Sequence, residues 1–138
     1  MTPDIESRIK MIEDRAQLTE LVGRYSQCVS QGLGQELVNM FTADGNFIAG
    51  KARATGHNEL EAIFLHMSPG NLVPLVTNLT LQVDGDRATG SSTLFSVIPG
   101  DEIKTYAGYY EDEFVRTDGS WKFSKRHFTF FYDQAGRA

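Results

Sequence analysis

The three histidines are the side chains of this sequence best suited to accept a proton near neutral pH. His127 lies in an aromatic-rich run that we expect to be a strand. Because side chains alternate across a strand, His127 faces away from Arg126 and Phe128 unless a bulge shifts the register. His57 and His66 lie at the start and on the polar side of an expected helix, where contact with solvent is the ordinary outcome. His127 is therefore a candidate base only if its own face lines a pocket.

Asp112 has the same strand parity as Tyr110, which makes it a candidate buried carboxylate with a raised pKa and a substitute base. The alternative is an ion pair between Arg126 and either Asp112 or Glu113, which would lower the carboxylate pKa. The Asp-Gly turn at 118–119 would place these strands side by side.

The remaining residues with possible site chemistry are Asn78 and Cys28. Asn78 could donate a hydrogen bond to a substrate oxygen, or equally to the backbone beside a strand turn. A single cysteine, Cys28, excludes an intrachain disulfide and a multi-cysteine zinc site, and nothing in its neighbourhood predicts an activated thiolate. The histidines lack metal-ligand spacing. We therefore expect no metal site.

Composition narrows the class of protein. The 138 residues carry a net charge of −5, are 41% hydrophobic and contain nine Phe and five Tyr. No basic stripe suits a nucleic acid, no run approaches the ~18 apolar residues of a membrane span, and no apolar signal-peptide core is present. The expectation is one domain over residues 1–138, located in the cytoplasm, with neither nucleic acid nor membrane as a partner.

Hydrophobic periodicity predicts helices followed by strands. The first helix begins near Asp4 and ends at the glycines after Gln31. A short helix over Gln35–Phe41, a turn over Thr42–Asn46, a short strand near Phe47 and a third helix after Gly56 come next. The period then becomes two, in four segments with Asp-Gly turns at 84–85 and 118–119: Val73–Val83, Arg87–Ile98, Lys104–Arg116 and Trp121–Tyr132. This order predicts an α+β fold with a four-stranded antiparallel meander.

Aromatic and aliphatic residues occupy both parities of the last strand and of the strand containing Phe95. A sheet with one wet face would alternate cleanly. We expect the three helices to cover one face and a second copy of the chain to cover the other. The sequence thus predicts a homodimer whose outer face includes Phe95 and Phe131.

The segments of the chain, in order, resemble the SnoaL-like branch of the nuclear transport factor 2-like (cystatin-like α+β) superfamily. The segments that carry the resemblance are 12–16 (IEDRA), 21–25 (LVGRY), 41–45 (FTADG), 77–78 (TN), 83–88 (VDGDRA), 108–113 (GYYEDE) and 119–123 (GSWKF). That family folds a curved sheet into a cone plugged by helices. Its members include polyketide cyclases, scytalone and bile-acid dehydratases and the lindane dehydrochlorinase. The resemblance implies cofactor-free acid–base chemistry on a hydrophobic small molecule, and it also extends to catalytically silent binders.

The eliminating members of this family use an Asp–His dyad, whose positions fall on Ser30 and Pro74 in this sequence. Neither residue can act as a base. The resemblance places Tyr25 inside the cone, where it could polarise a carbonyl, although a buried tyrosine completing the helix stripe is an equal alternative. The resemblance also implies that Arg126 faces the cavity as an anion-holding cation.

The predicted catalytic residues are therefore Tyr25, Arg126, Asp112 and His127. The residues predicted to bind substrate are Asn78, Tyr110, Phe128, Phe130, Phe41 and Leu94. The predicted function is that of a cofactor-independent lyase, isomerase or cyclase for a hydrophobic small molecule. The alternative is a non-catalytic binding or dimerisation module of the same fold.

Overall fold

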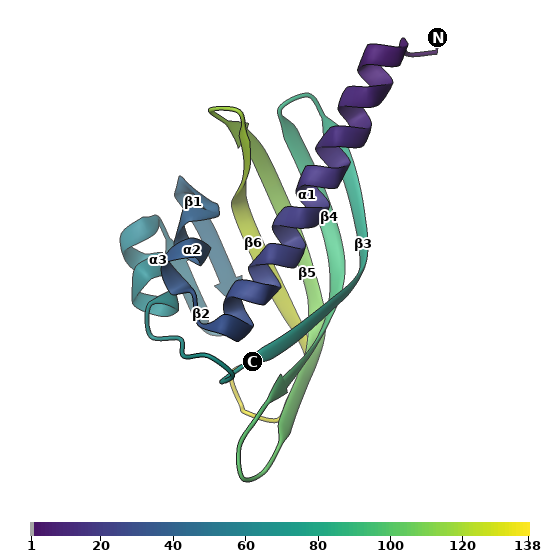
Figure 1. Cartoon of the computed structure of the whole chain (residues 1–138). Helices are drawn as coiled ribbons and strands as arrows, with labels where there is room; N and C mark the ends of the chain where they lie inside the picture. The colour runs from purple at the N-terminus through teal and green to yellow at the C-terminus, as the bar shows by residue number, and fades with distance from the viewer. Residues whose placement is uncertain (1) are drawn as a thin grey trace.

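The computed structural model describes residues 2–138, in which helices pack on one face of a curved sheet (Figure 1). The elements follow the order α1 (Ile5–Gln31), α2 (Gly34–Asn39), β1 (Phe41–Ala49), β2 (Ala52–Thr55), α3 (His57–Phe64), β3 (Val73–Asp84), β4 (Arg87–Ile98), β5 (Lys104–Thr117) and β6 (Ser120–Asp133). The strands form a single sheet in the order β2-β1-β6-β5-β4-β3. The pairing of β1 with β6 is parallel and the others are antiparallel. The α+β class and the meander are as predicted.

Helix α1 begins and ends where the sequence predicts. The Asp4 side chain accepts a hydrogen bond from the Ser7 amide at 2.7 Å, and Gly32 closes the helix at φ 71°. Leu18, Val22 and Tyr25 are buried where α1 crosses the concave face of the sheet. The first turns of α1 project past the ends of the strands (Figure 1), and residues 2–13 are all exposed.

The region after α1 differs from the prediction. Helix α2 ends at Asn39, and Phe41, predicted to close that helix, is instead the first residue of β1. The predicted turn over Thr42–Asn46 is part of the same strand. The parallel register with β6 shifts between Phe41 and Asn46, and this irregularity accommodates the turn-like residues. Strand β2 was not predicted, because four residues with only Ala54 buried give no periodic signal.

The second half of the chain agrees closely with the prediction. Helix α3 follows Gly56, which adopts φ 83°. Strands β3 to β6 match the four predicted segments to within two residues. At the two Asp-Gly turns, Gly85, Asp118 and Gly119 all have positive φ, as tight hairpins require.

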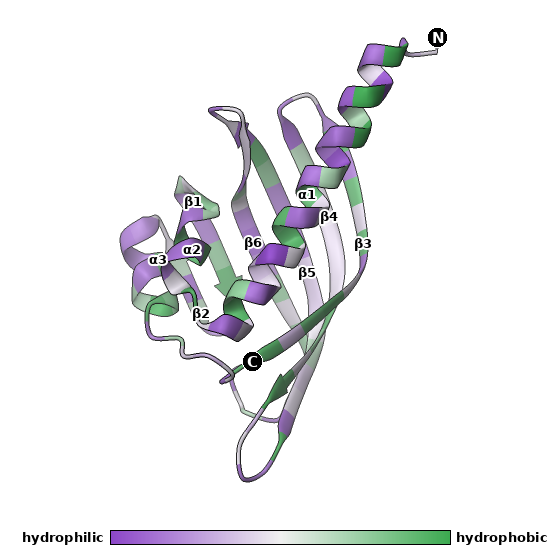
Figure 2. Cartoon of the chain, in the orientation of Figure 1, coloured by the Kyte–Doolittle hydropathy of each residue, from purple (hydrophilic) through white to green (hydrophobic). Residues whose placement is uncertain are grey.

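The two faces of the sheet have different surroundings. The concave face carries the core against the helices, with Phe41, Phe114 and Phe123 almost completely buried. The convex face leaves an apolar patch exposed, formed by Leu75, Phe95, Phe131 and Tyr132. Hydrophobic and hydrophilic bands alternate along α1 up to its projecting end (Figure 2). Within residues 2–138, no helix has the length and apolar character needed to cross a membrane.

Candidate functional site

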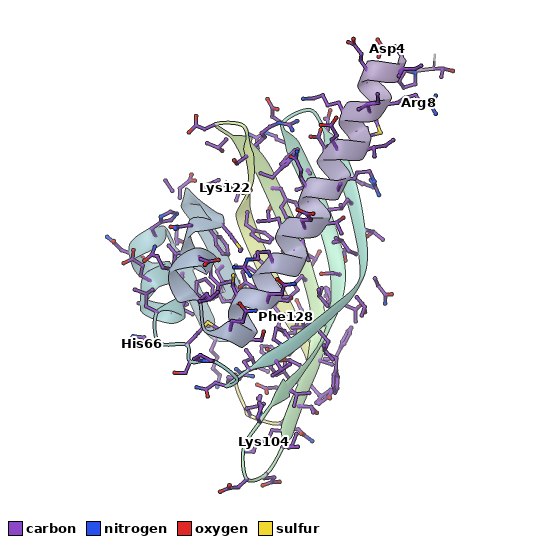
Figure 3. All side chains as sticks on the ribbon, in the orientation of Figure 1. Asp4, Arg8, His66, Lys104, Lys122 and Phe128 are labelled. Atoms are coloured by element: carbon purple, nitrogen blue, oxygen red, sulfur yellow. The ribbon has the colours of Figure 1, made fainter. Side chains whose placement is uncertain are left out.

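A cavity of about 600 Å³ lies between α1, α3 and the concave face of the sheet. This volume suits a small organic ligand. Most of its wall is apolar, and it is built from α1, α3, the strands β1, β2, β3, β5 and β6, and connecting and terminal segments. The lining residues are Tyr25, Val29, Phe47, Ala49, Lys51, Ala52, Ile63, Phe64, Met67, Leu72, Pro74, Tyr106, Tyr110, Phe128, Phe130 and Arg137. In Figure 3, Phe128 lies among the side chains gathered near the C-terminal end of α1, whereas His66 lies at the periphery.

Three tyrosines and two cations are the polar groups of this wall. Tyr25, Tyr106 and Tyr110 are buried, whereas Lys51 and Arg137 lie at the exposed end of the cavity. The Arg137 guanidinium stacks on the Tyr106 ring at 4.6 Å. Among the lining residues, all of which lie in the described part of the chain, there is no Asp, Glu or His. The wall can therefore donate hydrogen bonds, but it holds no conventional base.

Tyr25 and Tyr110 meet edge to face, with ring centroids 6.4 Å apart. Burial raises the pKa of the Tyr25 phenol well above its usual value, with a further contribution from Tyr110, while the nearby Arg126 cation acts in the opposite direction. Burial also raises the pKa of Tyr110, again against the effect of Arg126. Both phenols are therefore protonated at neutral pH, which makes them hydrogen-bond donors rather than bases.

Arg126 lies directly behind these tyrosines and is 0% exposed. Its Cζ atom lies 3.5 Å from the Tyr110 ring centroid, 4.3 Å from that of Tyr25 and 4.7 Å from that of Phe123. Strand pairing places Asp112 opposite Arg126, and Oδ1 of Asp112 lies 3.2 Å from Nε of Arg126. The ion pair predicted from the hairpin is therefore confirmed. Cation–π contact and this single carboxylate hold the guanidinium.

Asp112 combines features of both alternatives considered from the sequence. It is paired with Arg126, yet its pKa is raised to about 6, because burial outweighs the opposing effect of the cation. Asp112 is 2% exposed as a residue, and it does not line the cavity. Asp112 can therefore influence a bound molecule only through Arg126 and the tyrosines, and direct proton abstraction by it would require a rearrangement.

Two buried serines add polar groups that sequence reasoning did not single out. Ser92 lies opposite Tyr110 and Ser96 opposite Tyr106 on the neighbouring strand. Both hydroxyl groups are buried without a hydrogen-bond partner in the described chain. The available signal was their parity, because both alternate in step with the buried Leu94 on β4. Lys51 and Arg137 were also missed, since both lie in connecting or terminal segments without periodicity.

His127 and Asn78 lie away from the cavity. His127 faces the convex side, opposite Glu111 on β5 and beside Lys125 in a polar groove. The opposite-face interpretation of the sequence is therefore confirmed, and a base role for His127 in the cavity is not compatible with this position. Asn78 is exposed at a bulge in β3, where it adopts φ 57°. It does not contact the cavity wall either.

The remaining predicted residues lie in or beside the cavity wall. Phe128 and Phe130 line it, as Tyr110 does. Phe41 lies deeper, in the aromatic core against Tyr25. Leu94 belongs to the buried cluster around Tyr110 and Phe128. These two support the wall from behind.

Neither residue at the positions of the family's Asp–His dyad can act as a base in this chain. Ser30 donates its hydroxyl hydrogen to the Gln27 carbonyl, and Pro74 contributes an apolar ring to the cavity wall.

His57 and Cys28 also lie outside the cavity wall. Nε2 of His57 lies 3.0 Å from the Phe41 carbonyl oxygen. Burial and a hydrogen bond to Glu36 raise the pKa of the Cys28 thiol, which is the opposite of activation. No group of three or more potential metal ligands occurs among residues 2–138.

A curved, mostly antiparallel sheet wrapped around an apolar cavity and closed by an N-terminal helix defines the cystatin-like α+β fold. A family model for the SnoaL-like domain matches residues 10–127, and the chain belongs to that family. An uncharacterized protein of Mycobacterium tuberculosis is 29% identical over 124 residues, covering 83% of this chain and 84% of that protein.

Solved structures share the fold at low sequence identity. A putative scytalone dehydratase from Novosphingobium aromaticivorans superimposes with a TM-score of 0.78 at 19% identity, covering 96% of this chain and 99% of that one. The LinA structure gives a TM-score of 0.81 at 24% identity, covering 94% and 95%. A type 2 hexachlorocyclohexane dehydrochlorinase gives 0.79 at 22%, covering 91% and 90%. At these identities, the likeness shows the fold alone.

Proposed function

We propose that this chain is a cofactor-independent acid–base enzyme, a lyase, isomerase or cyclase, acting on a hydrophobic small molecule held in the cavity. The observation that carries the proposal is the pair of protonated tyrosines, Tyr25 and Tyr110, set in an apolar wall with the Arg126 cation stacked behind them. The family supports a small-molecule enzyme of this general kind.

The tyrosines donate hydrogen bonds to a carbonyl oxygen of the substrate. When a proton leaves the adjacent carbon, or a ring closes, negative charge develops on that oxygen. Preorganised donors and a cation in a water-poor site stabilise such a charge far better than water does. Because the wall holds no carboxylate or imidazole, the proton passes to a water molecule or to a basic group of the substrate itself.

A specific observation also favours the second candidate, a binding module without catalysis. The family's Asp and His positions hold Ser30 and Pro74, and no other base takes their place on the wall. In that case the same tyrosines hold a ligand oxygen without promoting a reaction.

Kinetics with a panel of hydrophobic β-hydroxy carbonyl compounds distinguish the two candidates. We expect Tyr25→Phe and Tyr110→Phe each to lower kcat about 10²–10³-fold, as removal of an oxyanion donor does. Tyr109→Phe is the matched control, because Tyr109 lies on the convex side against Phe131. Ligand binding measured by calorimetry with no turnover across the panel would favour the module. Turnover that survives loss of both tyrosine hydroxyls, of Asp112 and of every histidine would show that the site is wrong.

We also infer that two copies associate through the convex patch of Leu75, Phe95, Phe131 and Tyr132. The support is the exposure of four large apolar side chains on one face of β3, β4 and β6, with Ala107 of β5 between Phe95 and Tyr132 in the strand register.

A further inference from the structure

The projecting part of α1 carries an uncovered apolar stripe. Ile5 is 70% exposed, Ile9 49% and Ile12 67%. Their spacing of four and then three residues places them on one side of the helix, and Ala16 continues the same row. Single exposed apolar residues are common on protein surfaces, but three isoleucines in a row on one helix face form a contiguous patch.

This row points away from the rest of the molecule. At about 100° per residue, it lies roughly 150° around the helix from the buried residues Asp14, Leu18 and Val22. Gly23 lies on the same outward side, and a Cβ added there would meet nothing within 4 Å. The sheet of the same chain therefore cannot cover this face, which is open along most of the helix.

The charges that flank the stripe are arranged to fit a second copy of the same helix. If the isoleucines occupy the a and d positions of a heptad, then Glu6, Glu13 and Glu20 all fall at e, and Arg8 and Arg15 both fall at g. In a parallel pair, each g residue meets the e residue five positions further along the partner. Each arginine then faces a glutamate. In an antiparallel pair, like charges would meet instead.

We propose that two copies of this chain pair in parallel through the outward face of α1. The isoleucine row forms the seam between the copies. Arg8 then pairs with residue 13 of the other copy, and Arg15 pairs with residue 20. One N–H group of Arg15 already donates to the Leu81 carbonyl of β3 at 3.0 Å, so this side chain would pair with the other copy through its remaining donors.

The short length of the seam is compatible with stable pairing. An isolated helix of this size is marginal in water, because nucleating it has a large entropic cost. Here the rest of α1 is already fixed on the sheet by Leu18, Val22 and Tyr25, so the projecting turns extend an existing helix. Pairing therefore does not have to order a disordered segment.

Disulfide trapping tests both the surface and its orientation. A d residue in a parallel pair faces its own copy, so Ile12→Cys should form a disulfide-linked dimer under mild oxidation at micromolar concentration. Cys28 is buried and does not compete. Met11→Cys is the matched control, because Met11 is 50% exposed but lies off the seam. Equal cross-linking of the two variants would overturn the proposal.

Charge exchange with light scattering is the second measurement. The wild-type mass should be an even multiple of one chain, and Ile12→Asp, at an exposed position that leaves the fold intact, should halve it. Arg8→Glu should weaken the assembly at least tenfold, and Arg8→Glu with Glu13→Arg should restore it. A mass unchanged by Ile12→Asp would refute the parallel pairing. So would a double variant that associates no more tightly than Arg8→Glu. Tyrosine-dependent turnover is read separately, so the two proposals fail independently.

Discussion

Replacing Arg126 by methionine should destabilise the fold strongly, and replacing Asp112 as well should recover most of the loss. Arg126 is 0% exposed and Asp112 is 2% exposed, so neither charge can return to water without opening the fold. Removing one partner of a buried pair typically costs about 3–5 kcal/mol, whereas replacing both with apolar residues is often close to neutral. For a chain of this size, that loss corresponds to a fall in Tm of roughly 10–15 °C.

The pH dependence of this loss identifies which charge is left alone. In Arg126→Met, Asp112 can take up a proton and so avoid being buried as an unpaired charge. Its pKa is already about 6 with the cation present, and it rises further without the cation. Above pH 6 the folded variant holds a proton that the folded wild type and both unfolded chains have released. Its stability relative to wild type should therefore fall as the pH rises above 6, with a slope that approaches about 1.4 kcal/mol per pH unit until the pH reaches the raised pKa of Asp112 in the variant. In Asp112→Leu, the unpaired Arg126 cannot lose its proton. The loss of stability relative to wild type should therefore be nearly constant between pH 6 and 8.

Urea unfolding of the wild type, both single variants and the double variant at pH 6, 7 and 8 measures all of these quantities. The coupling free energy between the two residues should be favourable and at least about 2 kcal/mol at pH 8. A double variant whose loss equals the sum of the single losses would refute the buried-pair interpretation. Four identical midpoints would mean that both residues are exposed, and the role proposed for Arg126 behind the tyrosines would then be lost as well.

Three further predictions follow from packing. Gly108→Ala should destabilise by at least about 3 kcal/mol in urea unfolding, because the added Cβ would lie 2.0 Å from the Thr129 carbonyl oxygen. Gly23→Ala should instead stabilise the helix by about 1 kcal/mol in the same assay, because the Cβ meets nothing and alanine favours the helix; a loss of stability would reveal a hidden contact. Phe131→Ser and Phe95→Ser should reduce the mass measured by light scattering without lowering Tm; an unchanged mass would exclude the convex patch as an interface.

Local patterns predicted most of the fold. The period of two over residues 73–132 and the Asp-Gly turns determined strands β3 to β6, because hairpins depend on residues that are neighbours in sequence. The parallel pairing of β1 with β6 was not predictable in this way. It joins Phe41 to Phe123, and the register is set by packing between distant segments rather than by local preference.

The sequence predicted on which face of the sheet each candidate residue lies, but it did not predict which of them reach the cavity. Alternation along β6 correctly separated His127 from Arg126, and the hairpin register correctly paired Arg126 with Asp112. Sequence parity could not reveal that Asp112 lies behind the wall rather than on it, since that depends on how far Tyr25 and Tyr110 extend over the pair. The family resemblance aligned Pro74 with the histidine of the dyad, but it did not predict that the proline lines the cavity.

The bulge at Asn78 has a consequence for the behaviour of this chain at high concentration. Strand β3 is an edge strand of twelve residues, and a regular edge of that length is a template on which further chains can add strands and form fibrils. The left-handed conformation of Asn78 breaks the row of amide and carbonyl groups near the middle of the strand. Further along the strand, the Leu81 carbonyl already accepts a hydrogen bond from the Arg15 guanidinium. No straight segment longer than about half the strand is therefore left to recruit a neighbour, and the edge is protected against aggregation.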